Sequence, residues 1–326
     1  MKPRADRERG ASLLSVLVIV MLMSAAAVAA TDALARSVAI AKSSGARAET
    51  FWTARGAAEA GAAYLSKITK PTEGHLTDKS SIFTQPAILP AGHGFVSIRV
   101  REASNCFNLN ALFDDSDNAA ISDGQLEAYR ALLVATGLSR NEAQSLADKL
   151  ADWMDSDMST RTFGAEDGRY ASMADPYRTA GARLRDISEL KAVEGYDADV
   201  LARIGGLVCL RPGVAQSKLN VNTLVPEQAP LLVSLFTAEL SLDDARALIE
   251  DRPAGGWLSA DTFLDEPAVK QIAPGARHDA AISAASAYLA ADVDIGTGDL
   301  ATSYRVLYGQ GSTGDMSLIS MVRRDS

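Results

Sequence analysis

An uncharged and mostly apolar stretch covers residues 11–31, directly after a short stub with net positive charge at residues 1–10. A helix needs about 20 apolar residues to cross a bilayer core, and the run from Ala11 to Ala30 meets that length. Positively charged flanks stay on the cytoplasmic side of a membrane. The pattern therefore predicts one membrane-spanning helix, with the chain after Asp32 exported.

The helical spacing of apolar residues continues beyond this span, and no proline occurs between Pro3 and Pro71. One helix over about residues 11–68 would be roughly 85 Å long. The alternative is a secretory signal peptide, cleaved within the alanine-rich residues 25–30. The two interpretations differ in whether the apolar segment stays in the mature protein.

The periodicity changes after this helix. Residues 71–94 are rich in Pro, Gly, Ser and Thr and indicate a connection. Alternating and β-branched residues then predict strands at 95–101, 287–295, 303–308 and 317–322. Helical signals fill the sequence between the first strand and the others: a helix near 125–136, a capping box at Ser139 to Glu142, and a helix from Asp186 that stops before Gly195. We expect an α+β fold, with a long N-terminal helix packed on an antiparallel sheet and a large all-α lobe inserted into it.

An internal repeat occurs twice in this middle region. Phe107 to Leu112 reads FNLNAL, and Leu219 to Leu224 reads LNVNTL. The alternation places both asparagines of each copy on one face, where their amides can cap a following helix. The repeat predicts two similar strand-to-helix connections.

The charge and the motifs of the chain exclude several classes of function. The chain of 326 residues carries a net charge of −9, which disfavours a phosphate backbone as partner. It contains no P-loop, no HExxH zinc motif and no GxSxG elbow, and its three histidines are scattered. We do not expect an enzyme.

The two cysteines, Cys106 and Cys209, would meet oxidising conditions after export. If they pair, they close a loop that stabilises the fold by at most about 4.7 kcal/mol in the chain-entropy estimate. Two buried free thiols are the alternative.

A short basic leader that ends in glycine, followed by a long apolar helix, resembles type IV pilins and the pseudopilins of type II secretion. The resemblance implies that a prepilin peptidase cuts between Gly10 and Ala11 and methylates the new amino terminus. The fifth mature residue is usually Glu in these families, and here it is Ser15. In related pilins that carboxylate is thought to pair with the terminal amine of the subunit already in the fibre, so its absence suggests a position at the tip.

The order of five further motifs is similar to the type II secretion system protein K family, the large minor pseudopilins. The motifs are CFNLNAL at 106–112, DWMDSD at 152–157, GAED at 164–167 with Tyr170, ISEL at 187–190 and NVNT at 220–223. The resemblance implies a tip subunit that primes pseudopilus assembly and aids export of folded periplasmic proteins across the outer membrane. A tip or minor pilin of a related type IV pilus or DNA-uptake system is the alternative.

The same resemblance implies partners and a location. The partners would be minor pseudopilins I and J, H through them, the major pseudopilin G, the prepilin peptidase and the inner membrane, with no nucleic acid. The chain would cross the bacterial inner membrane once, with its N-terminus cytoplasmic and its bulk periplasmic.

The family resemblance also implies a division of the chain into six segments. These are a leader peptide at 1–10, the transmembrane and assembly helix at 11–70, the N-terminal portion of the pseudopilin sheet at 71–110, the inserted helical lobe at 111–205, a strand and helix-hairpin-helix-like segment at 206–284, and the C-terminal portion of the pseudopilin sheet at 285–326. The last helical segment is similar to DNA-binding helix-hairpin-helix modules, but its hairpin at 237–241 has no glycine and carries Glu239.

Family members bind calcium in the helical lobe, and the matching residues here are Asp155, Asp157, Glu166 and Asp167. Calcium takes about six to eight oxygen ligands, commonly from carboxylates on a flexible loop. A plain solvated acidic loop is the alternative. A second acidic loop with Asp114, Asp115 and Asp117 could hold another ion or cap the helix that begins near Asp123.

Overall fold

The computed structural model describes residues 5–91, 94–114, 120–211, 213, 215–297 and 300–324. Contacts along the chain define two compact units, Met1–Ala57 and Ala58–Ser326. Helix α1 (Ala5–Thr69) is continuous, which confirms the predicted long helix, and the single turn η1 (Lys70–Thr72) follows it. By length and composition α1 can cross a membrane: its candidate span begins at Leu13, with a mean hydropathy of 2.7 and no burial of its most apolar window. Gly10 and Ala11 lie within this helix.

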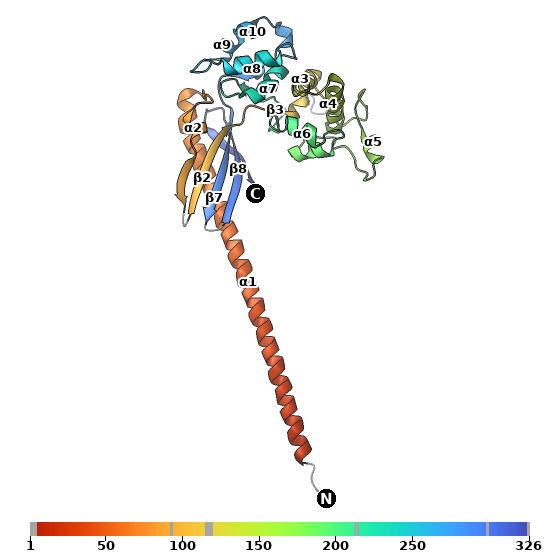
Figure 1. The fold of residues 1–326 in the computed structure, drawn as a ribbon, viewed down its shortest axis with the longest axis vertical. Coiled ribbons are helices and arrows are strands. Elements are labelled where there is room, and N and C mark those ends of the chain that lie inside the picture. The colour runs from red at the N-terminus through yellow and green to blue at the C-terminus, as the bar shows by residue number, and fades with distance from the viewer. Residues whose placement is uncertain are drawn as a thin grey trace. The chain divides into compact units, whose positions relative to one another are not determined.

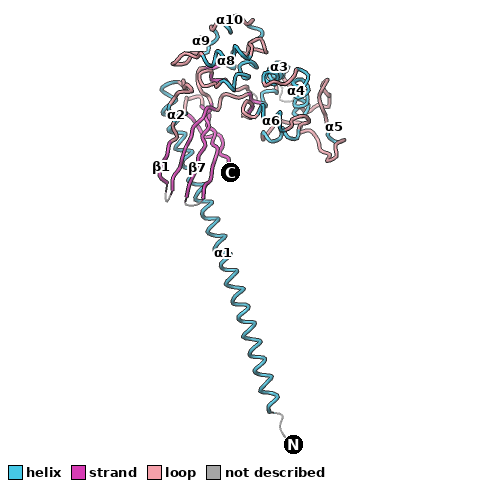
Figure 2. Tube along the Cα trace, viewed as in Figure 1, coloured by secondary structure: helices cyan, strands magenta, loops and turns pink. Residues whose placement is uncertain are grey.

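A five-stranded antiparallel sheet has the order β1-β2-β7-β8-β9 (Figures 1 and 2). Its strands are β1 (Ala87–Ala91), β2 (Gly94–Glu102), β7 (Tyr288–Thr297), β8 (Leu300–Gln310) and β9 (Met316–Arg324). Four of them confirm the predicted strands. Strand β1 and the preceding helical turn α2 (Ser81–Thr84) lie in the segment that the sequence predicted to be a connection. The strand accommodates Pro90 because it lies at the edge of the sheet, where a missing N–H costs no ladder hydrogen bond.

The C-terminal end of α1 packs against this sheet. Leu65 is buried, and the Tyr308 hydroxyl of β8 donates to the carbonyl of Ala58 at 3.0 Å. The backbone N–H of Met316 donates to the Ser66 hydroxyl at 2.8 Å. Residues 58–69 of the helix thus form one wall of the sheet's core.

The helical residues are inserted between two neighbouring strands, since β2 pairs with β7 and Glu102 lies opposite Leu289. A first helical module contains β3 (Phe107–Asn108), η2 (Leu109–Leu112), α3 (Asp123–Ala135), α4 (Arg140–Met154), α5 (Asp167–Ala171), η3 (Ile187–Ala192), α6 (Ala198–Ile204) and β4 (Val208–Cys209). A second contains β5 (Leu219–Asn220), η4 (Pro226–Gln228), α7 (Ala229–Leu235), α8 (Leu242–Glu250), α9 (Ala260–Leu264), α10 (Pro267–Lys270), η5 (Pro274–Ala276), η6 (Asp279–Ala281) and β6 (Ile282–Ser283). One buried apolar cluster runs through both modules, so the core continues across the boundary placed at residue 205.

The two copies of the asparagine repeat build matching structures. In the first, the Asn110 amide holds the backbone of Leu184 by two hydrogen bonds of 3.0 Å. In the second, the Asn222 amide holds the backbone of Trp257 by bonds of 2.7 and 2.9 Å. Each copy starts a short strand that pairs in parallel with the last strand of its own module. The predicted pair of similar connections is therefore present, and each asparagine closes its module around a distant loop.

Two glycines of α1 test the packing of helix on sheet. A Cβ at Gly61 would lie 2.7 Å from the Tyr308 hydroxyl, whereas one at Gly56 would meet nothing within 4 Å. We expect Gly61→Ala to lower the free energy of unfolding by about 1–3 kcal/mol through overpacking. Gly56→Ala should raise helix stability by up to about 1 kcal/mol. Thermal melting of the two variants in detergent checks the contrast, and equal shifts would contradict this packing.

Candidate functional site

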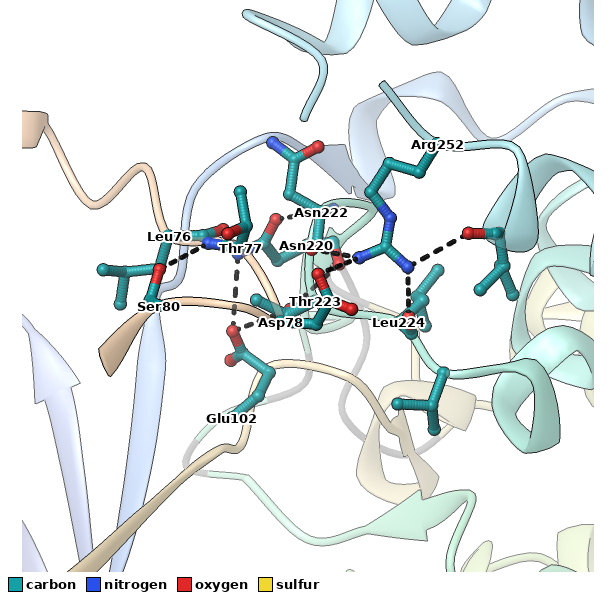
Figure 3. Close-up of polar contacts among 12 residues, drawn as sticks. Leu76, Thr77, Asp78, Ser80, Glu102, Asn220, Asn222, Thr223, Leu224 and Arg252 are labelled. Atoms are coloured by element: carbon teal, nitrogen blue, oxygen red, sulfur yellow. Dashed lines mark hydrogen bonds and ion pairs between the residues drawn. The ribbon is translucent and has the colours of Figure 1, made fainter. Parts of the chain in front are cut away.

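The junction between the sheet and the second helical module is a network of polar side chains centred on Glu102, the last residue of β2 (Figure 3). One carboxylate oxygen accepts from the backbone N–H groups of Ala103 and Ser104, at 2.9 and 2.8 Å. The other accepts from the hydroxyls of Thr223 and Ser286, at 2.9 and 2.5 Å. Glu102 thus joins the point where the chain leaves the sheet, the second repeat and the point where the chain returns.

Arg252 extends this junction to the segment after α1. Its guanidinium donates to the carbonyl oxygens of Asn222 and Leu224, the latter at 2.6 Å, and pairs with Asp78 at 3.3 Å (Figure 3). The Arg252 side chain is only 8% exposed. Because an unpaired buried charge is costly to desolvate, these carbonyl oxygens and the Asp78 carboxylate stabilise the buried guanidinium. The junction is therefore built for rigidity.

A disulfide joins Cys106 and Cys209, so of the two alternatives that the sequence left open the structure has the pair and not two free thiols. Cys209 is the last residue of β4, and β4 pairs in parallel with β3, which begins one residue after Cys106. The bond closes the first helical module at the two ends of its chain. Because it restricts the unfolded chain, it stabilises that module most.

Three of the four predicted metal ligands meet at one place. The carboxylate groups of Asp155, Asp157 and Glu166 offer oxygens that all lie within 4.8 Å of one another. They come from the C-cap of α4, the loop after it and the N-cap of α5. Asp167 does not join them: its carboxylate accepts from the backbone N–H and hydroxyl of Thr179, both at 2.9 Å.

The cluster has carboxylate oxygens without donors. Glu166 is 6% exposed, and both of its carboxylate oxygens and one of Asp155 have no hydrogen-bond partner. Burial, followed by the charges of Asp152, Asp155 and Asp157, raises the pKa of Glu166 to about 7. Burial likewise raises the pKa of Asp155. Buried anionic oxygens without donors are what a hard divalent cation requires, so these residues fit calcium.

Three neighbours of this cluster were not predicted from the sequence to lie beside it. Asp152 is fully buried, and Arg161 bridges it to Asp155 with ion pairs of 2.8 and 2.7 Å. Gly164 packs against Asp152 so closely that a Cβ there would lie 1.8 Å from a carboxylate oxygen. The DWMDSD motif contained Asp152, but only the folded loop brings Arg161 and Gly164 beside it.

The other candidate features have plainer roles. Asp115 and Asp117 lie outside the described residues. The N-cap of α3 is Ser122, whose hydroxyl accepts from the backbone N–H of Gln125. The hairpin between α7 and α8 turns through Thr237 and Ala238, whose φ angles are 43° and 63°. The left-handed turn that usually favours glycine is thus made by two larger residues.

The long apolar helix, the antiparallel sheet on its C-terminal end and the helices inserted between adjacent strands define a pilin-like subunit with a helical insertion. Two family models described as type II secretion system (T2SS), protein K, match residues 105–213 and 219–284. These ranges coincide with the two helical modules.

Individual relatives agree. The chain is 33% identical over 262 residues to type II secretion system protein K of Pectobacterium carotovorum, covering 79% of each protein. It is 31% identical to protein K of Aeromonas hydrophila, covering 99% of this chain and 98% of that one. A chain in the crystal structure of the GspK-GspI-GspJ complex from enterotoxigenic Escherichia coli matches with a TM-score of 0.69 and 26% identity, covering 86% of this chain and 99% of that one. The chain belongs to the type II secretion system protein K family, and is thus a structural component of a secretion apparatus.

The raised pKa of Glu166 predicts a pH dependence in the presence of a chelator. The ordinary pKa is 4.5, so between pH 4.5 and about 7 the folded chain binds more protons than the unfolded chain. The free energy of unfolding should therefore fall as the pH rises through this interval. Glu166→Gln should remove that fall in denaturant titrations, whereas Glu239→Gln, at an exposed position, should leave it intact. A wild-type stability that rises over the same interval would contradict the assignment.

Proposed function

We propose that this protein is the minor pseudopilin at the tip of a type II secretion pseudopilus, where it primes assembly and aids export of folded periplasmic proteins across the outer membrane. Helix α1 anchors it in the inner membrane, with the N-terminus cytoplasmic and the bulk of the chain periplasmic. The observation that carries the proposal is the insertion between β2 and β7: it runs from residue 103 to residue 287, more than half of the chain.

The insertion supports a terminal position on steric grounds. A subunit inside a helical fibre repeats the same contacts above and below itself. An insertion with its own disulfide and buried core is too large and too rigid to be compressed between stacked copies. At the end of a fibre it meets no subunit above.

The amino terminus supports the same position. Cleavage after Gly10 makes Ser15 the fifth residue of the mature chain. A hydroxyl carries no charge with which to neutralise a terminal amine in the bilayer, where an unpaired charge is costly. A subunit without Glu at this position has no carboxylate to pair with the terminal amine of a subunit already in the fibre. It therefore suits the first place in the fibre, where there is no such subunit.

The partners follow from the same position. One solved structure with a similar fold is a complex named for GspK, GspI and GspJ. We infer that this chain associates with the I and J minor pseudopilins, with H through them, and lies above the major pseudopilin G.

A calcium ion completes the proposal. Asp155, Asp157 and Glu166 would hold it, and Asp155 and Glu166 have buried oxygens that lack donors. The ion would add positive charge to that of Arg161 and tie the end of α4 to the start of α5 across the loop.

Mass spectrometry of the N-terminus tests processing. With a co-expressed prepilin peptidase, the mature chain should begin at Ala11 and carry one added methyl group. Without the peptidase the leader should remain. Gly10→Val should block the cut, because the leaders that this chain resembles end in glycine, while Gly45→Val should not. A chain that begins after residue 30 would contradict both the anchor and the tip position.

Calcium should raise the melting temperature of the full chain in detergent by several degrees, since a ligand bound only to the folded state stabilises it. Asp155→Asn with Asp157→Asn should abolish the rise. Asp167→Asn is the matched control and should keep it, because that carboxylate lies apart and an amide can still accept from Thr179. Equal loss in both variants, or no rise in the wild type, would exclude this site.

A further inference from the structure

The two edge strands of the sheet differ in how readily they can pair with a further strand. Strand β1 has five residues and contains Pro90. Strand β9 has nine residues without proline and pairs with β8 alone. Among the described residues no strand pairs with the outer side of β9. A long edge without proline presents unpaired backbone groups that accept a further strand.

The side chains beside this edge are apolar and basic. Tyr304 and Val306 of β8 face the core, so the alternating residues Ser303 and Arg305 face outward. Their register partners on β9 are Arg324 and Val322. Val322 is 62% exposed and the Arg324 side chain is 46% exposed. The outward side of β9 therefore presents an apolar residue and a cation two positions apart.

A buried acid orients the cations on this face. Asp292 of β7 is 8% exposed and receives a bidentate pair from Arg101, at 3.0 and 3.1 Å. Arg305 and Arg324 each approach the same carboxylate at 3.3 Å. One carboxylate thus fixes three guanidinium groups, and a guanidinium has five donors in total. Donors remain for a second carboxylate.

The face has an excess of positive charge on an acidic protein. Arg99 is exposed and lies opposite Asp292 in the register, so four arginines accompany two acids, Asp292 and Asp294. The whole chain has a net charge of −9. All four cations are arginines, whose planar fork matches a carboxylate better than an ammonium group does.

We propose that β9 binds an extended acidic segment of a partner protein by strand addition. Neighbouring strands lie about 4.8 Å apart, so alternate side chains of the added strand would lie beside Val322 and Arg324. The segment would place an apolar side chain next to Val322 and a carboxylate, two residues away, next to Arg324. Main-chain hydrogen bonds supply affinity in this mode of recognition and the side chains supply specificity.

A polypeptide fits this surface better than a membrane or a nucleic acid. Asp292 and Asp294 interrupt the positive charge, which disfavours a continuous array of phosphates. Exposed Val322 gains from an apolar neighbour that a phosphate backbone does not offer. This proposal does not depend on the position in the fibre or on calcium.

The test uses the full chain in detergent and a fluorescein-labelled peptide of alternating Val and Glu. Fluorescence anisotropy should show binding that weakens with salt, and amide hydrogen exchange should slow over residues 316–324. The same peptide with Lys in place of Glu should not bind. Arg324→Glu should weaken binding about five- to tenfold by replacing an attractive pair with a repulsive one.

Arg246→Glu on α8 is the matched control, because its side chain is 49% exposed, and it should leave binding unchanged. Val322→Glu serves as a second variant on β9 itself, at a side chain that is 62% exposed, and should weaken binding in the same direction. Three results would overturn the proposal: no binding of the Val and Glu peptide, binding without protection of residues 316–324, or preferential binding of phosphatidylglycerol vesicles or duplex DNA at the same ionic strength.

Discussion

The carboxylate of Glu102 is the contact on which the organisation of the chain depends. It accepts hydrogen bonds from the segment that leaves the sheet, from Thr223 of the second repeat and from Ser286 at the return. Adjacent strands β2 and β7 can pair only if both ends of a very long insertion meet at this point. The entropy lost on closing so long a loop is large, and compact, hydrogen-bonded modules reduce the loop that remains. The Glu102 network is thus what makes a large insertion compatible with a small sheet.

The two helical modules are held by the same kind of asparagine contact, made to a different loop in each. In each, an asparagine amide holds a distant backbone, Leu184 in the first and Trp257 in the second. The first module then carries the acidic cluster after α4, whereas the second places Arg252 after α8, where it binds backbone carbonyls of its own repeat. The first module thus has buried carboxylate oxygens of Asp155 and Glu166 that lack donors, and the second has an internal cation.

Much of the fold could be predicted because its signals are local. The long helix, four of the five strands and the capping box at Ser139 each follow from residues within a few positions of one another. Strand β1 could not be predicted in this way, since residues 87–90 are exposed and the strand is defined by its backbone pairing with β2 rather than by its own composition. The candidate site depended on the family: the motif named the acidic loops, but only packing separates Asp167 from the cluster and brings Arg161 into it. The open edge of β9 could not be predicted from the sequence, because the order of strands in the sheet depends on the whole fold.

The central claim is that a pilin-like subunit with a large helical insertion ends the fibre rather than repeating within it. The most direct measurement is a count of this subunit along single pseudopili, by fluorescent labelling of its helical modules and comparison with a labelled major pseudopilin. The account predicts one copy per fibre, always at one end. Copies distributed along the length would contradict it.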